Sequence, residues 1–140
     1  MNTEKVLPTR GQLERQLSQT LQSMYRKQFG HLPSKISCHI FADKVAIVAE
    51  NTATSVEKIL FQNFRLDLAR NIRLAMSQAF TEQVKAVITD ILQVRVVDTI
   101  ADSTSDGNYL GMIVFLEGYP KVRLPKKRSF RNNNSSVITQ

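Results

Sequence analysis

The stretch that decides the fold is FRLDLARNIRLAMSQAFTEQVKAVITDIL, residues 64–92. Apolar side chains recur along it at the three- and four-residue spacing of a helix, and it contains neither proline nor glycine. The pattern predicts one long amphipathic helix. A shorter helix should precede it, because Thr54 and Glu57 have the spacing of a capping box. We expect a kink or a break between the two helices at Asn63–Phe64.

A further amphipathic helix is predicted near the start of the chain. Thr9 and Gln12 form another capping box, and leucines follow at helical spacing on one side. Gly30 tolerates the left-handed conformation that often ends a helix, and Pro33 prevents its continuation. This helix should therefore run from about Thr9 to Gly30.

Four other segments have the alternating pattern of β-strands. A tight reversal at Asp43–Lys44 should join the first two as an antiparallel hairpin. A turn cluster around Asp106–Gly107 should join the last two. The predicted strands are residues 35–41, 45–50, 94–101 and 109–117.

These elements predict an α+β fold in the order α-β-β-α-α-β-β, with a small, mainly antiparallel four-stranded sheet packed on two main helices. The last strand is apolar on both faces, which is typical of a strand covered on both sides. Because the helices can cover only one face, we expect a second copy to cover the other. The candidates for this homodimer interface are Leu110, Met112, Val114 and Leu116.

Charge is distributed unevenly along the chain. Residues 118–140 hold six of the 19 lysines and arginines, whereas all 12 acidic residues precede them. We therefore divide the chain into a flexible N-terminus (1–8), a nearly neutral domain (9–117) and a basic, disordered tail (118–140). The tail suits an acidic protein surface, nucleic acid or acidic lipid equally, or serves only solubility. Its candidate contacts are Lys121, Arg123, Lys126, Lys127, Arg128 and Arg131.

No catalytic, metal or cofactor site is predicted. Cys38 and His39 are adjacent, but neighbouring strand residues point to opposite faces, so Cys38 should be a buried, inert thiol. Asp98, Asp102 and Asp106 are interpreted as solvated turn residues rather than acid–base groups. The histidines and the single cysteine lack metal-ligand spacing, and the glycines form no phosphate-binding pattern.

Arg65, Arg70 and Arg73 lie near the start of the long helix, where cations oppose the helix dipole. Either they form a solvated face or an intersubunit salt bridge, or they contact an anion or an acidic partner. One cysteine permits no internal disulfide, and no stretch approaches the length of a membrane span. We expect a cytoplasmic protein that can sit at the membrane surface.

Residues 11–116 resemble the MpsC-type domain, a bacterial domain family named for a Na+-translocating membrane-potential-generating system. Gln93 departs from the family, which tends to have glycine there. The resemblance implies an accessory protein or regulator tied to ion or inorganic-carbon transport. The motifs that carry it are Gly11 with Glu14, the turn Phe29–Pro33, Asp43 before the strand Val45–Val48, Thr54–Leu60 with Glu57, Arg73, and the final strand Val114–Leu116.

The leading hypothesis is therefore a non-enzymatic, homodimeric interaction module that binds a membrane-associated or acidic protein. The alternative is a nucleic-acid-binding protein that uses the basic tail. An enzyme would require a concave site that includes Asp98 and Asp102.

Overall fold

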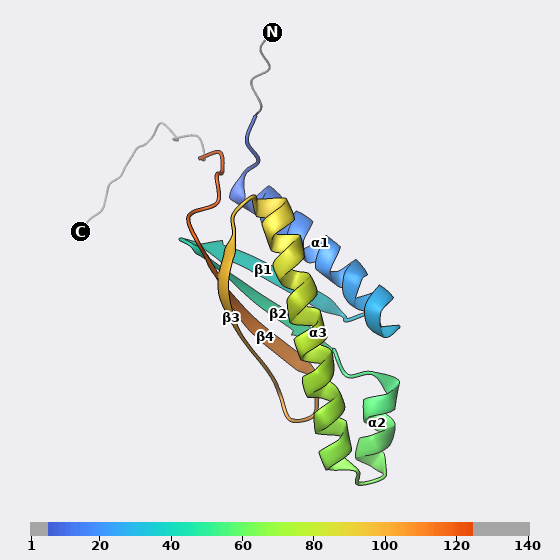
Figure 1. Ribbon diagram of the computed structural model, residues 1–140. Helices are drawn as coiled ribbons and strands as arrows, with labels where there is room; N and C mark the ends of the chain where they lie inside the picture. Colours follow the sequence, from blue (N-terminus) through green and yellow to red (C-terminus); the bar gives the residue numbers. More distant parts are fainter. Residues whose placement is uncertain (1–5, 125–140) are drawn as a thin grey trace, which may run out of the picture.

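The structure is a computed structural model that describes residues 6–124, which form three helices and one four-stranded antiparallel sheet (Figure 1). The order of the elements and the α+β class confirm the prediction. The elements are α1 (Arg10–Phe29), β1 (Lys35–Phe41), β2 (Lys44–Glu50), α2 (Ser55–Gln62), α3 (Leu66–Leu92), β3 (Val96–Ser103) and β4 (Tyr109–Leu116).

The helix ends follow the local sequence. The Thr9 hydroxyl accepts a hydrogen bond from the Gln12 amide, and the Gln12 side chain accepts one from the Thr9 amide, so the predicted capping box forms. Gly30 ends α1 with a φ of 67°. Gln93 ends α3 in the same left-handed region, with a φ of 56°. That conformation favours glycine and explains why a glycine would suit this position.

The strands are ordered β1-β2-β4-β3 across the sheet, so β2 and β4 are central. The reversal between β1 and β2 lies at Ala42–Asp43, one residue earlier than predicted, because Lys44 already pairs with Phe41. Strand β3 begins at Val96 rather than Val94, and its pairing with β4 is irregular near its start. Both differences shift an element boundary without changing the topology.

Helices α1 and α3 cover one face of the sheet (Figure 1). The core between them contains Tyr25, Phe29 and Phe80, whose rings pack edge-on, with ring centroids 4.7 Å apart for Tyr25 and Phe29 and 5.2 Å for Tyr25 and Phe80. Such aromatic pairs add to the stabilisation that burial provides. Val84 and Ile88 extend the buried stripe of α3 toward its C-terminus. The long helix therefore organises the core, as its periodicity predicts.

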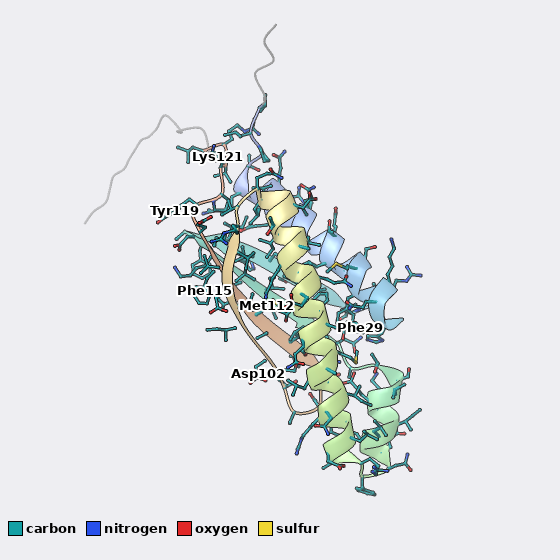
Figure 2. The ribbon with its side chains drawn as sticks, viewed as in Figure 1. Phe29, Asp102, Met112, Phe115, Tyr119 and Lys121 are labelled. Atoms are coloured by element: carbon teal, nitrogen blue, oxygen red, sulfur yellow. The ribbon has the colours of Figure 1, made fainter. Side chains whose placement is uncertain are left out.

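The predicted dimer contacts on β4 are wrong. Leu110, Met112, Val114 and Leu116 are all buried within the chain, because this set of alternate residues faces α1 and α3. The other set faces away from the helices. Figure 2 shows this contrast for Met112, which lies toward α3, and Phe115, which lies on the opposite side of the strand.

The start of the basic segment has a defined path. The Arg123 amide donates a hydrogen bond of 2.8 Å to the Pro8 carbonyl, and Thr9 and Arg123 form a parallel bridge. Pro120 is buried, and Val122 packs against the core. Disorder is thus not observed for residues 118–124, contrary to our prediction for them. The rest of the predicted tail, 125–140, lies outside the described residues, as do residues 1–5.

Candidate functional site

The face of the sheet that points away from the helices, which we call the outer sheet face, is largely apolar. Phe41, Val48, Ile100 and Tyr109 are exposed there by 46, 43, 62 and 51%. Because side chains alternate along a strand, these four residues lie on the face of the sheet opposite the one that carries the core residues. Ala46, Ile113 and Phe115 are half-buried and fill the centre of the same face. Lys44 lies between Phe41 and Phe115 on this face, so the apolar surface is centred on Ala46, Val48 and Ile113. An exposed apolar surface is typical of an interaction site.

Charges on the outer sheet face are separated across it. Lys35 on β1 and Lys44 on β2 lie toward one edge, whereas Asp98 and Asp102 lie on the opposite edge strand, β3. Glu50 on β2 is the exception. The face therefore has a basic side, an apolar centre and an acidic side.

A second feature is a buried ion pair between α2 and α3. The Arg73 guanidinium donates from Nε to Glu57 Oε2 at 2.8 Å and from Nη2 to Glu57 Oε1 at 2.7 Å. Glu57 is fully buried, and it also accepts hydrogen bonds from the amide and hydroxyl of Thr54. This two-pronged geometry is the strongest form of arginine–carboxylate contact. It fixes α2 to α3.

The same arginine connects three further parts of the chain. Arg73 donates to the Thr52 carbonyl at 2.8 Å and to the Tyr25 hydroxyl at 3.1 Å, and Tyr25 donates to the same Thr52 carbonyl at 2.8 Å. Gly107 lies close by with a φ of 77°, and a side chain there would meet Glu57 Oε2 at 2.7 Å. The network therefore joins α1, the β2–α2 connection, both helices of the pair and the β3–β4 turn.

The burial of Arg73 in this network contradicts the prediction that Arg73 contacts an anion or an interface. Arg73 is only 6% exposed, so it is not available to an external anion or to a second subunit. Burial by itself lowers the pKa of Arg73, but the hydrogen bonds with Glu57 and the neighbouring Tyr25 outweigh it and leave that pKa raised. Burial raises the pKa of Tyr25, so this phenol stays neutral. Arg65 and Arg70 are exposed, and neither side chain makes a hydrogen bond in this network.

Arg70 lines a shallow cavity of about 230 Å³ between α3 and the end of β3. Asp102, Ser103 and Thr104 form its other wall. Asp98 does not line it, so the two carboxylates that an acid–base enzyme would require do not meet there. Asp106 instead accepts hydrogen bonds from Asn108 and Thr104, which lower its pKa and mark it as a turn former.

Cys38 is buried on the core face, and burial raises its pKa to about 11. A thiol of that kind is protonated and unreactive at neutral pH. His39 lies on the opposite face of β1, as the alternation predicts. Within residues 6–124, no group of three or more histidine, cysteine, aspartate or glutamate side chains converges on a metal position.

Of the six tail cations, only two lie in the described part of the chain. Lys121 and Arg123 are exposed, and Figure 2 shows Lys121 near the start of α1. Lys126, Lys127, Arg128 and Arg131 lie outside the described residues. Among the helices that the structure describes, none has the length and apolar composition of a membrane span.

Sequence reasoning missed a third feature, an apolar tip on the paired helices α2 and α3. We call the residues that form it the hairpin tip: Val56, Ile59, Phe64, Leu66 and Leu68, exposed by 56, 55, 87, 39 and 37%. Val56 and Ile59 are three residues apart in α2, a helical spacing that by itself indicates core packing. The one signal in the sequence is Phe64 beside Asn63, where a large aromatic residue occupies a predicted break.

Comparison with known proteins gives one result that bears on identity. Searches of curated proteins and of solved structures each found no match. The model of the family described as Na+-translocating membrane potential-generating system (MpsC) matches residues 9–118, nearly the whole described fold. Glu57, Arg73, the outer sheet face and the hairpin tip all lie within the matched range. The chain belongs to the MpsC family.

Proposed function

We propose that this chain is a non-enzymatic accessory protein of a Na+-translocating membrane system and that it acts by binding other proteins. Membership of the MpsC family supports the link to such a system. The observation that carries the interaction role is the outer sheet face, with Phe41, Ile100 and Tyr109 exposed in one layer. A surface of that composition is stabilised when another protein covers it.

A second copy of the chain is the proposed partner for the outer sheet face. Two antiparallel sheets commonly pack face to face, with their strands nearly aligned. A two-fold axis parallel to the strands would place β1 of one copy over β3 of the other. Lys35 of one copy would then lie near Asp102 of the second, Phe41 would lie near Asp98, and the apolar centres would meet. The charge separation therefore makes this face complementary to itself.

The proposal can be tested by affinity purification of the tagged full chain from detergent-solubilised native membranes. We expect recovery of an ion-translocating membrane protein together with an untagged copy of the chain. Ile100→Lys should lose the untagged copy, because it replaces the most exposed apolar side chain that we assign to this face with a charge that the second copy would have to bury. Leu124→Lys is the matched control: Leu124 is also exposed but lies outside the sheet, so that variant should retain the copy. Recovery of the tagged chain alone would contradict the proposal.

Nucleic-acid binding is the second candidate, and the observation that favours it is the acid-free segment 118–140 with its six cations. Neutralising about six phosphates gives a slope of about −5 for log K against log salt on duplex DNA. Titration of labelled duplex at several salt concentrations measures that slope. A flat salt dependence, or no complex at low salt, would rule this candidate out.

A further inference from the structure

The hairpin tip lies at the end of the molecule away from the termini. Figure 1 shows α2 and the start of α3 extending past the sheet, while the start of α1 and residues 118–124 lie at the opposite end. In α2, only Glu57 is buried. The outward side chains of this helix, including Val56 and Ile59, therefore have no cover from the described chain.

Phe64 occupies the turn of the hairpin in a conformation that does not suit its side chain. Its φ is 59°, in the left-handed region that favours glycine, and its ring is 87% exposed. The turn is held by backbone hydrogen bonds from the Phe64 amide to Phe61 and from the Arg65 amide to Leu60. Since glycine would serve these bonds better, folding of the chain gives no reason for an aromatic residue here. Strain of this kind points to a functional role.

The charges around the hairpin tip are mainly positive. Lys58, Arg65 and Arg70 are exposed on α2, at the turn and on the first turns of α3. Asp67 is the exposed acidic residue among them, because Glu57 is buried and paired with Arg73. An apolar tip flanked by cations has the composition of elements that lie in the interface of anionic membranes.

The tip is also held rigidly. The Glu57–Arg73 pair fixes α2 to α3, and the bonds from Arg73 to Thr52 and Tyr25 fix both helices to the rest of the fold. The apolar residues are thus presented in a fixed arrangement rather than on a mobile loop.

We propose that the hairpin tip is a membrane-contact site that takes an anionic lipid surface. Phe64 and Ile59 enter the boundary between headgroups and acyl chains, and Lys58, Arg65 and Arg70 contact the lipid phosphates. A lipid surface fits better than a second copy, because two tips would bring like charges together. The inference depends on the hairpin alone, so its failure would leave the proposed dimer unaffected.

The chain contains no tryptophan, so Phe64→Trp introduces a single fluorescent reporter at the tip. With vesicles of phosphatidylglycerol and phosphatidylcholine, we expect its emission to shift to shorter wavelength, and the shift to shrink in high salt. Vesicles of phosphatidylcholine alone should give a smaller shift. A shift that depends on protein concentration without vesicles would indicate protein contact and overturn the proposal.

Leu124→Trp is the matched reporter at the other end, where Leu124 is 79% exposed beside the basic segment. We expect little change in its emission with the same vesicles. If this reporter shifts and Phe64→Trp does not, the basic segment binds the lipid and the proposal for the hairpin tip is wrong.

Co-sedimentation with the same anionic vesicles tests the native side chain. Phe64→Gly in the full chain should weaken binding by roughly ten- to a hundredfold, the effect of losing one buried aromatic side chain. Tyr119→Ser removes another exposed aromatic residue at the opposite end and should bind as the unchanged chain does. Because glycine suits the turn, Phe64→Gly should fold normally, and unchanged binding by a folded Phe64→Gly protein would refute the proposal.

Discussion

The sheet with α1 and the C-terminal part of α3 differs from the α2–α3 hairpin in what holds each together. In the first region, apolar side chains such as Leu17, Val84 and Phe80 are fully buried. In the second, the buried side chains are the ion pair Glu57–Arg73 and the small Ala69, while Phe64 and Ile59 are exposed. Apolar burial thus stabilises one region, and a directional polar network positions the other. The difference indicates that the hairpin's apolar residues serve contacts outside the chain.

The largest expected effect is in the sheet region. Phe80→Ala should lower the free energy of unfolding by about 3–5 kcal/mol, because it removes a fully buried ring that packs on Tyr25. Urea denaturation followed by circular dichroism measures the change. Phe64→Ala is the matched control in the hairpin, and its ring is 87% exposed. A comparable loss in both variants would remove the contrast between the two regions.

The next effect tests the polar network. Glu57→Gln should cost about 3 kcal/mol, because it leaves the Arg73 guanidinium buried without its counter-ion. Glu82→Gln breaks the exposed pair with Lys85 and should change stability by less than about 0.5 kcal/mol. Both values come from the same denaturation experiment. Equal effects of the two variants would show that Glu57–Arg73 does not fix the hairpin.

A pH titration tests the core face of β1. The folded-state pKa of Cys38 is raised from 9.0 to about 11, so the folded state retains a proton that the unfolded state loses. Its contribution is fully present below pH 9 and is lost as the pH rises to 11, by about 2–3 kcal/mol. Denaturation of the unchanged chain and of Cys38→Val across that range measures the loss. The same slope in both proteins would refute the assignment to Cys38.

The smallest expected effect has the opposite sign. Phe64→Gly should leave stability unchanged or raise it by up to about 1 kcal/mol, because glycine relieves the left-handed strain at a φ of 59°. The melting temperature of the two proteins is the measurement. A clear loss of stability would mean that the Phe64 ring packs within the chain, and the hairpin tip would then belong to the fold.

The sequence alone predicts the features that depend on residues close together along the chain. The capping boxes at Thr9 and Thr54 and the period of residues 64–92 predict the helices, and the alternation of the four strand segments completes the order of the described elements. The sequence also predicts that Cys38 and His39 point to opposite faces of β1, because successive side chains alternate along a strand.

Features that depend on distant residues could not be predicted in this way. Alternation shows that β4 has two apolar faces, but which face meets the helices depends on sheet order and register. Sequence reasoning treats Arg73 as an exposed cation because its partners Tyr25, Thr52 and Glu57 are far from it in sequence. The same holds for the hairpin tip, since only the packed structure shows that helical apolar residues remain uncovered.

The central claim is that the outer sheet face, unlike the covered core face, binds a second copy of the chain. Light scattering coupled to size-exclusion chromatography tests it most directly on the full chain, whose monomer mass is 15.9 kDa. The account predicts twice that mass for the unchanged chain and the monomer mass for Ile100→Lys. A monomer mass for the unchanged chain at every concentration tested would contradict it.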